Sequence, residues 1–324
     1  MKVAVTGATG HVGANLVRAL VERGDQVRAL VHDDERGLDG LPVEQVRADV
    51  RDAKSLLEGF EGVDLVFHLA ARISIAPGDA DEVEKVNVGG TRNVVDACLA
   101  QKVERLCHFS SIHALSPEPR HGTVDEARPL AEQSWLPYDR SKAGGEREIE
   151  KGVQRGLDAV TVNPTAVLGP HDYRPSPLGS VLLDLYHRRL PGLVDGGFDW
   201  VDVRDVVAGA LAAAAKGRTG ERYLLGGTRR TVLELARTVE KVTGSRAPRF
   251  VSPMWLARAS APFATGWARL TGQRARLTAE SLHALRNHQQ VSHDKAAREL
   301  GYTPRPLEDT VAATFAWFKE AKVV

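Results

Sequence analysis

A glycine-rich turn near the amino terminus limits the possible folds of this chain more than any other feature. The turn Thr6–Gly13 (TGATGHVG) follows an apolar run, Val3–Thr6, and opens a helical pattern over Ala14–Arg23. In such a turn the first glycine permits a tight bend, the second lets backbone approach a diphosphate, and the third allows close packing of helix on strand. The helix N–H groups and the helix dipole favour a bound anion. The sequence therefore predicts a dinucleotide-binding turn made by Gly7, Thr9, Gly10, His11, Val12 and Gly13.

The first half of the chain alternates β-branched runs with helical stretches. This alternation is typical of a parallel sheet with helices on both faces. The helical pattern recurs over Thr91–Ala100 and Ser141–Lys151, which we expect to be crossover helices. The predicted strands are Val3–Thr6, Val27–Val31, Glu44–Ala48, Leu65–Leu69, Leu106–Ser110 and Val160–Val162.

The pattern changes after residue 163, where four prolines and one glycine between residues 164 and 177 interrupt regular structure. Trp200–Lys216, as strand plus helix, and Tyr223–Leu225, as a strand, are expected to return to the first domain. The predicted fold is α/β. A Rossmann-type doubly wound parallel sheet spans residues 1–165, with 199–226 returning to it, and a smaller, mostly helical C-terminal substrate domain spans 166–198 and 227–324.

Composition excludes several classes of partner. Lys plus Arg number 43 and Asp plus Glu 42, and this near-neutral balance argues against nucleic acid or an anionic membrane as a partner. The longest apolar run, Val206–Ala215, is far shorter than the ~20 residues of a bilayer span. Cys98 and Cys107 lack partners at metal-ligand spacing, and a strand that begins at Lys2 leaves no room for a signal peptide. We expect a cytoplasmic enzyme without a metal.

The end of the second strand distinguishes NAD from NADP. Val31 and His32 occupy the two positions where an NAD enzyme usually carries an acidic side chain, and Arg28 and Arg36 are close enough in sequence to reach a 2′-phosphate. Asp33-Asp34 would act in the opposite direction if the turn aimed them inward. The sequence favours NADP and leaves NAD open. Asp49 and Val50, which end the third strand, are predicted to lie beside the adenine.

A phenol and an ammonium, Tyr138 and Lys142, are spaced to share one face of a helix. A tyrosine with a pKa of ~10 is a poor acid–base group at neutral pH, and a neighbouring cation favours the phenolate. The lysine can also hydrogen-bond the nicotinamide ribose. This pair is therefore the predicted acid–base centre.

The predicted strand that ends in Ser110-Ser111 supplies hydroxyl groups at the carboxyl edge of the sheet, where ligands of such sheets bind. Ser111 is predicted to hold the substrate oxygen, and Ser110 to lie nearer the cofactor. His113, in the following loop, is a candidate substrate contact and a weaker candidate for a second acid. The remaining histidines show no metal-ligand spacing.

Taken in order, these motifs resemble the extended short-chain dehydrogenase/reductase superfamily, also described as the NAD-dependent epimerase/dehydratase group. Val27–Asp33 resembles its dihydroflavonol-reductase-like branch, and Val162–Gly227 resembles hopanoid-associated sugar epimerases. The resemblance covers nearly the whole chain. It rests on Thr6–Gly13, Asp49-Val50, Phe67–Ala71, Asn87, Gly90-Thr91, Asn93, Phe109–Ser111, Tyr138, Lys142, Asn163–Thr165, Gly169-Pro170, Val201–Asp205 and Lys295–Tyr302.

The resemblance implies roles for the matching positions and a homodimer through the helices near Val88–Ala100 and Ser141–Lys151. Leu69, Ala70 and Ala71 would line the cofactor, and Asn87 would lie under its nicotinamide half; Pro164, Thr165 and Val167 would close over the nicotinamide, with Arg174 and Arg204 toward the substrate. His32 stands where dihydroflavonol-reductase-like enzymes carry an arginine, which weakens the case for NADP. Arg274, Arg276 and Arg286 are the candidates for a sugar-nucleotide diphosphate.

The leading hypothesis is an NAD(P)-dependent oxidoreductase that transfers a hydride between nicotinamide and a carbonyl or alcohol of a small molecule. One alternative is a nucleotide-sugar epimerase or dehydratase with tightly bound NAD. Another, of a different class, is a non-catalytic dinucleotide-sensing regulator. The segment Pro253–Leu270 is either a pocket for an apolar substrate or ordinary core; its apolar residues are Met254, Trp255, Leu256, Phe263, Trp267 and Leu270.

Overall fold

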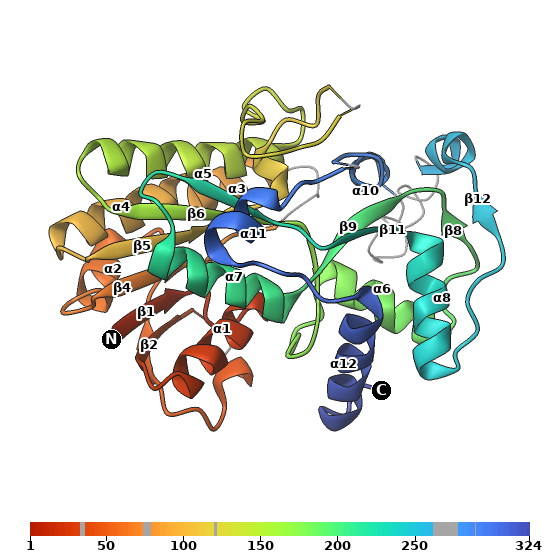
Figure 1. Cartoon of the computed structure of the whole chain (residues 1–324), viewed down its shortest axis with the longest axis horizontal. Helices are drawn as coiled ribbons and strands as arrows, with labels where there is room; N and C mark the ends of the chain where they lie inside the picture. Colours follow the sequence, from red (N-terminus) through yellow and green to blue (C-terminus); the bar gives the residue numbers. More distant parts are fainter. Residues whose placement is uncertain (33–35, 74–78, 120–121, 262–277, 289) are drawn as a thin grey trace.

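The computed structural model describes residues 1–32, 36–73, 79–119, 122–261, 278–288 and 290–324. Among these residues the central layer is a seven-stranded parallel sheet of strand order β10-β6-β5-β4-β1-β2-β3 (Figure 1). Its strands are β1 (Lys2–Thr6), β2 (Gln26–Val31), β3 (Glu44–Arg47), β4 (Leu65–His68), β5 (Arg105–Phe109), β6 (Ala159–Pro164) and β10 (Arg222–Leu225). The six strands predicted in the first half of the chain are confirmed.

Helices cover both faces of this sheet, as the alternating pattern predicted (Figure 1). On one face α1 (His11–Glu22) and α7 (Val203–Lys216) pack into one core with the odd-numbered side chains of β1. On the other face α2 (Ala53–Gly59), α4 (Gly90–Ala100) and α5 (Pro137–Gln154) contribute Leu56, Val94 and Ile149 to a second core. Because both faces are covered, β4 and β6 are buried along their whole length.

Most of the elements after β6 form a third core beside the sheet. A three-stranded sheet, β11-β9-β7, and a two-stranded sheet, β12-β8, pack with helices around Trp200, Phe315 and Phe318. Their bounds are β7 (Ala166–Leu168), β8 (Leu193–Val194), β9 (Gly197–Asp202), β11 (Thr228–Thr231), β12 (Val251–Ser252), α6 (Pro177–Tyr186), α8 (Val232–Thr243) and α12 (Leu307–Glu320). The shorter elements are α3 (Ala80–Glu84), α10 (Ala279–Ala284) and α11 (Asp294–Leu300).

The segment expected to return to the first domain is divided in the structure. The helix α7 and the strand β10 join the layers of the central sheet, because α7 packs on β6 and β10 pairs with β6. The strand β9 pairs instead with β7 and β11, in the small sheet. The division of the chain into two domains at the proposed boundaries stays a prediction.

The strand order reverses between β1 and β4, and the glycine turn lies at this point. Gly7 has φ +68°, and a Cβ there would lie 2.7 Å from the backbone nitrogen of Ala70. A Cβ on Gly13 would lie 2.1 Å from the carbonyl oxygen of Gly7. The turn, the end of β4 and the first turn of α1 are therefore packed backbone against backbone.

This packing predicts a large effect of one added methyl group. Gly13→Ala should lower the free energy of unfolding by about 3 kcal/mol or more, because backbone atoms must move apart. Chemical denaturation followed by circular dichroism measures it. Gly89→Ala is the matched control, since Gly89 has helical φ −59° and no described residue lies within 4 Å of its added Cβ. Similar losses in both variants would contradict the packing argument.

Candidate active site

A chain of hydrogen bonds joins the ends of β1 and β4 to α4. The Thr6 hydroxyl donates to Nδ1 of His68 at 2.7 Å, and Nε2 of His68 donates to Oγ1 of Thr91 at 3.1 Å. This direction follows because the Thr91 hydroxyl itself donates to the carbonyl oxygen of Asn87, at 2.6 Å. Burial lowers the pKa of His68 to about 3, so the ring stays neutral. The Ala70 N–H donates to Thr6 Oγ1 at 3.2 Å, so the predicted cofactor-lining segment that follows β4 is anchored to the turn.

The first turn of α1 is arranged to receive an anion. Its N-cap residue, Gly10, makes no side-chain cap, and the first turn holds no acidic residue. Nε2 of His11 donates to the carbonyl oxygen of Pro170 at 3.1 Å, and Asn15 donates to the same oxygen at 2.9 Å. A Cβ on Gly10 would meet, among the described residues, only the carbonyl oxygen of Gly7 at 3.4 Å, so the turn leaves room for a ligand there.

At the end of β2, His32 lies 3.3 Å from Oδ2 of Asp49. Arg51 binds both carboxylate oxygens of Asp49, at 3.0 Å and 2.6 Å, and holds the pKa of Asp49 at about 2. Arg36 begins the short helical turn Arg36–Leu38 and is exposed. The neighbouring candidates Asp33 and Asp34 lie outside the described residues.

The prediction that Arg28 could reach a 2′-phosphate is wrong. Its Nε pairs with Glu44 at 2.9 Å, and its Nη1 donates to the carbonyl oxygens of Gly59 and Glu61 at 3.1 Å and 2.9 Å. Arg28 precedes the end of β2 by three residues. Its side chain therefore links β2 to β3 and to the end of α2, and it does not lie at the edge of the sheet where a ligand would bind.

Tyr138 and Lys142 lie one turn apart near the start of α5, next to the end of β5. The side chain of Ser111 lies near the phenolic hydroxyl of Tyr138 and acts to lower its pKa. The His113 N–H donates to Ser111 Oγ at 3.2 Å, and the His113 ring lies edge-on to the Tyr138 ring, with 5.6 Å between centroids. Nζ of Lys142 donates to the carbonyl oxygen of Phe109 at 3.1 Å. The structure therefore brings together Ser111, Tyr138, Lys142 and His113.

Burial dominates the protonation of this pair. It raises the pKa of Tyr138 to about 12, although the hydrogen bond from Ser111 opposes the shift. It lowers the pKa of Lys142 to about 8, with the Glu146 carboxylate opposing that shift. The expectation that Lys142 brings the pKa of Tyr138 down is therefore wrong for this structure, because removal from water disfavours both charged forms.

Asn87 ties the segment after β4 to α5. Its Nδ2 donates to the carbonyl oxygen of Arg72 at 3.0 Å and to Oγ of Ser141 at 2.9 Å, and its Oδ1 accepts from the Arg72 N–H at 2.7 Å. Ser141 in turn donates to the carbonyl oxygen of Tyr138 at 2.8 Å. Asn87 lies in a π-helical turn, Lys85–Gly89, of the kind often found at functional sites.

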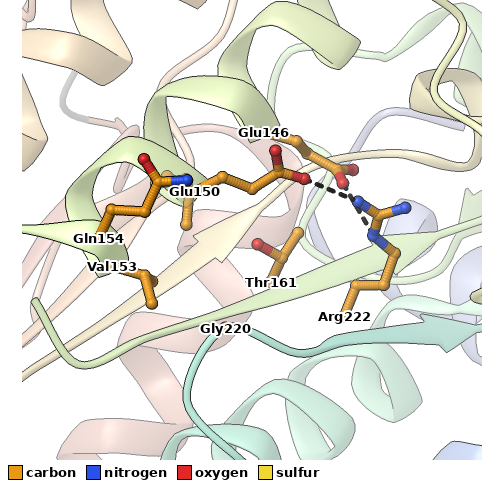
Figure 2. A pocket seen from close by; sticks show the side chains of 8 residues that line it. Glu146, Glu150, Val153, Gln154, Thr161, Gly220 and Arg222 are labelled. Carbon is orange, nitrogen blue, oxygen red and sulfur yellow. Dashed lines mark hydrogen bonds and ion pairs between the residues drawn. The ribbon is translucent and has the colours of Figure 1, made fainter.

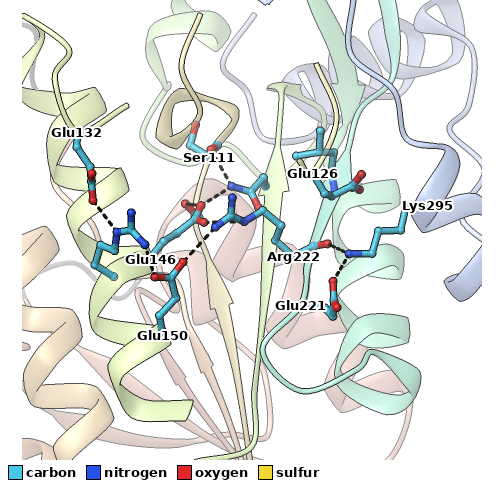
Figure 3. Close-up of polar contacts among 12 residues, drawn as sticks. Ser111, Glu126, Glu132, Glu146, Glu150, Glu221, Arg222 and Lys295 are labelled. Atoms are coloured by element: carbon cyan, nitrogen blue, oxygen red, sulfur yellow. Dashed lines mark hydrogen bonds and ion pairs between the residues drawn. The ribbon is translucent and has the colours of Figure 1, made fainter. Parts of the chain in front are cut away.

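A buried carboxylate, Glu146, lies at the centre of a group of polar contacts beside Ser111 (Figure 3). Its Oε1 accepts hydrogen bonds from Ser110 Oγ and Asn163 Nδ2, both at 2.6 Å, and its Oε2 pairs with Nε of Arg222 at 3.1 Å. The same Asn163 amide donates to the carbonyl oxygen of Ser111 at 3.0 Å. Glu146 thus fixes the backbone of the predicted substrate-binding serine.

Sequence analysis missed Glu146, although a signal was present. It follows Lys142 by four residues and therefore continues the same helix face as the predicted pair. Burial raises its pKa, while Arg222 and the two hydrogen-bond donors oppose the shift. Figure 2 shows Glu146 and Glu150 on α5 paired with Arg222. Together with Thr161 these side chains line a cavity of about 250 Å³.

The remaining residues predicted to contact the cofactor or the substrate lie in or after β6 and β7 and around α6 and α7. Thr165 follows β6, and its hydroxyl donates to Asp199 at 2.8 Å; Val167 lies in β7 and pairs with Val201. Both nitrogens of the Arg204 fork bind Asp202, at 2.9 Å and 2.6 Å. Arg174 is exposed in the loop before α6. None of these contacts joins Arg174 or Arg204 to Tyr138 within the described residues.

The apolar segment that begins at Pro253 is only partly described. Met254 is buried with Ala257 and Leu282 in a small core, whereas Trp255 is 71% exposed and Leu256 39%. The candidates Phe263, Trp267 and Leu270 lie outside the described residues, as do Arg274 and Arg276. Arg286 lies 3.9 Å from Asp195.

The reversed strand order, the glycine turn at the reversal and the helix behind it define an α/β protein of the Rossmann type. The chain belongs to the NAD dependent epimerase/dehydratase family, whose model matches residues 3–226. It is an enzyme of the extended short-chain dehydrogenase/reductase superfamily, as the motifs predicted.

Similar proteins cover the full length of the chain. It is 38% identical over 333 positions to sterol demethylase protein B of Methylococcus capsulatus, with 100% of both chains aligned. It is 33% identical to a putative dihydroflavonol 4-reductase of Synechocystis sp., over 97% of this chain and 94% of that protein. The crystal structure of gox2253 matches with a TM-score of 0.86 at 35% identity and covers 98% of each chain.

The described residues contain no helix long and apolar enough to cross a membrane. They also contain no group of three or more His, Cys, Asp or Glu side chains placed to hold a metal ion.

The burial of Lys142 predicts a conflict between stability and activity. A pKa of about 8, against the usual 10.5, corresponds to a destabilisation of about 3 kcal/mol while the amine is charged in both states. Lys142→Met should therefore raise the free energy of unfolding at pH 7 by about 1–3 kcal/mol and remove turnover. Urea unfolding and a cofactor-linked activity assay measure the two effects.

The stability that Lys142→Met adds should fall as the pH rises. The unfolded chain binds more protons than the folded one between pH 8 and 10.5, so the wild type gains stability as pH rises through that window. The advantage of Lys142→Met therefore shrinks between pH 7 and pH 10.5. Lys151→Met, on the exposed side of α5, is the control, with a change within about 0.5 kcal/mol. A Lys142→Met protein less stable than wild type at pH 7 would contradict the argument.

Proposed function

We propose that the enzyme is an NAD(P)-dependent oxidoreductase that interconverts a carbonyl and an alcohol, with Tyr138 as the acid–base group. The observation that carries this proposal is the convergence of three side chains where the residues after β5 meet the start of α5: Ser111, Tyr138 and the buried Lys142, which lies one turn from Tyr138. Both hydroxyls are hydrogen-bonding groups that a substrate oxygen can accept from. In this arrangement Ser111 positions the oxygen and Tyr138 exchanges the proton.

A nicotinamide cofactor, when bound, supplies or accepts the hydride. The turn Gly7–Gly13 and the uncapped start of α1 would hold its diphosphate, and the open side of Gly10 supports that fit. Lys142 would hydrogen-bond the nicotinamide ribose. The adenine would lie at Asp49 and Val50, and the nicotinamide half would lie among Leu69, Ala70, Ala71, Asn87, Ser110, Pro164, Thr165 and Val167.

The protonation state of Tyr138 favours one direction of the reaction. With a pKa of about 12 the phenol stays protonated at neutral pH, so it is ready to donate to a carbonyl oxygen. In that direction the carbonyl carbon gains a hydride while its oxygen takes the phenolic proton. The protonated phenol therefore supports carbonyl reduction as the forward reaction.

The substrate that we propose is an apolar ring compound with a secondary alcohol or ketone. The relatives named sterol demethylase protein B and putative dihydroflavonol 4-reductase support this class, because both names refer to polycyclic or aromatic ring compounds. The described arginines give a sugar-nucleotide diphosphate less support, since Arg204 is held by Asp202. Turnover of a sugar nucleotide with cofactor that survives purification would favour the epimerase alternative.

We propose NADPH as the preferred cofactor. His32 and Arg36 stand on either side of the loop after β2, where a 2′-phosphate would lie. Asp49, which lies 3.3 Å from His32, is paired with Arg51, so its negative charge is offset. We also propose a cytoplasmic homodimer through α4 and α5, for which light scattering of the purified protein gives the mass.

Removal of a single oxygen atom tests the mechanism. Tyr138→Phe should lower kcat by a factor of about 100 or more, because the proton donor is lost, and should leave the Kd of the cofactor within about twofold. Stopped-flow measurement of NADPH oxidation and fluorescence titration of the cofactor provide the two values. Tyr186→Phe, on α6, is the matched control. Near-normal turnover of Tyr138→Phe would exclude this mechanism.

Removal of the positive charge of Arg36, in the turn after β2, tests the cofactor preference. Arg36→Ala should raise the KM for NADPH about tenfold and leave the KM for NADH within about twofold, because one charge-assisted contact with the phosphate is lost. Arg28→Ala is the control, since Arg28 binds Glu44 and two carbonyl groups elsewhere. If Arg36→Ala changed both KM values equally, the proposed phosphate contact would be absent.

A further inference from the structure

The segment around β12 exposes large apolar side chains to solvent. Phe250 is 59% exposed, and Trp255 and Leu256, in the helical residues 254–261, are 71% and 39% exposed. This short helix buries only its other face, in a small core that it shares with α10. Trp255 is therefore not ordinary core, which was one of the two hypotheses for this segment. Exposed apolar side chains with a charged rim are typical of a surface that binds a membrane or another molecule.

The charges around these side chains have one sign. Between Glu240 and Glu280 the sequence contains seven Lys or Arg residues and no Asp or Glu. Arg246, Arg249 and Arg258 are exposed, and no carboxylate in the described part of the chain pairs with any of them. The near-neutral balance of the whole chain therefore conceals a local excess of positive charge.

The end of α6 adds to this excess. It lies beside the segment, because the Ser245 hydroxyl donates to the carbonyl oxygen of Tyr186, and the exposed Arg188 follows Tyr186 by two residues. The acidic residue that follows β8, Asp195, lies 3.9 Å from Arg286. Since that negative charge is offset, the surface keeps its positive sign.

We propose that this part of the protein docks on an anionic lipid bilayer. Tryptophan and phenylalanine side chains favour the boundary between lipid headgroups and acyl chains, and arginines favour the phosphates above it. A bilayer rich in anionic lipid offers both partners on one surface, so it matches this combination of apolar and basic side chains. The aromatic–basic surface consists of Arg246, Arg249, Phe250, Trp255, Leu256 and Arg258.

Two contacts separate the aromatic–basic surface from the start of α5. Leu282 of α10 shares a small core with Met254, and the ring of the next residue, His283, lies 5.5 Å from that of Trp135. Trp135 precedes Tyr138 by three residues. An apolar ring compound dissolves in the same bilayer, so docking would bring the active site to its substrate. This last consequence, unlike the docking itself, rests on the proposed function.

Vesicle sedimentation tests the docking without substrate or turnover. The full-length protein is mixed, at about 0.1 M NaCl, with sucrose-loaded vesicles of phosphatidylglycerol or of phosphatidylcholine, and the unbound protein is measured after centrifugation. We expect the Kd for phosphatidylglycerol to be lower by about tenfold or more. Raising NaCl to about 0.5 M should weaken that binding about tenfold, because salt screens the attraction between arginine and headgroup.

Two variants each remove one feature of the aromatic–basic surface. Trp255→Ser should weaken binding to phosphatidylglycerol vesicles about tenfold, because the exposed ring no longer enters the headgroup region. Arg246→Gln combined with Arg249→Gln should weaken it about 20-fold and reduce its dependence on salt, because two charges near the lipid surface are lost. Both changes are at exposed positions, so circular dichroism should show an unchanged fold.

The matched controls lie at the opposite end of the molecule from β12 (Figure 1). Leu57→Ser removes an exposed leucine from α2, and Lys54→Gln combined with Lys102→Gln removes two exposed charges from α2 and from the turn after α4. Each control should bind phosphatidylglycerol vesicles within about twofold of the wild type.

Each result decides the inference. Absence of wild-type binding to phosphatidylglycerol, equal binding to both lipids, or equal losses in the variants and their controls overturns the docking and leaves the proposed function standing. Conversely, near-normal turnover of Tyr138→Phe removes the proposed function and leaves the docking standing. Light scattering without vesicles distinguishes another occupant: a lower mass for Trp255→Ser than for the wild type means that a second copy covers this surface, and it overturns the lipid proposal.

Discussion

At the reversal of strand order the backbone of the turn lies directly against the backbone of β4 and α1. Gly7 faces Ala70, and Gly13 faces the Gly7 carbonyl group, with no space for a side chain between them. The hydrogen-bond chain from Thr6 through His68 then holds β1, β4 and α4 together. Because these contacts fix where the first helix begins, they also fix where an anion can bind and where the edge of the sheet lies.

Exclusion of water governs the chemistry at that edge. Burial raises the pKa values of Tyr138 and Glu146 and lowers that of Lys142, so in each case it disfavours the charged form. A group that stays charged there, such as Lys142 at neutral pH, destabilises the fold, and shifted pKa values of this kind cluster at functional sites. The site is therefore maintained by the packing around it, above all by the contacts of Glu146 with Ser110, Asn163 and Arg222.

The fold was predictable where the sequence pattern is local and periodic. The glycine turn, the six strands of the first half and the helix that bears Tyr138 all follow from short-range signals. The small sheet β11-β9-β7 did not, because its short strands pair across distant parts of the chain. For the site, residue spacing identified Tyr138 and Lys142. The raised pKa of Tyr138, the hydrogen-bond partners of Arg28 and the contacts of Glu146 depend on burial and on distant parts of the chain, which spacing does not reveal.

The anchoring of Ser111 has a consequence for how the molecule can be divided. Its backbone is held by Asn163, Asn163 is held by Glu146, and Glu146 is paired with Arg222 on the edge strand β10. The first 165 residues contain every member of the catalytic set but lack this last support. An excised amino-terminal half would therefore carry the catalytic side chains without the contact that supports the end of β5. The active site depends on a strand that follows the small sheet in the chain, so it cannot be separated from the second half of the protein.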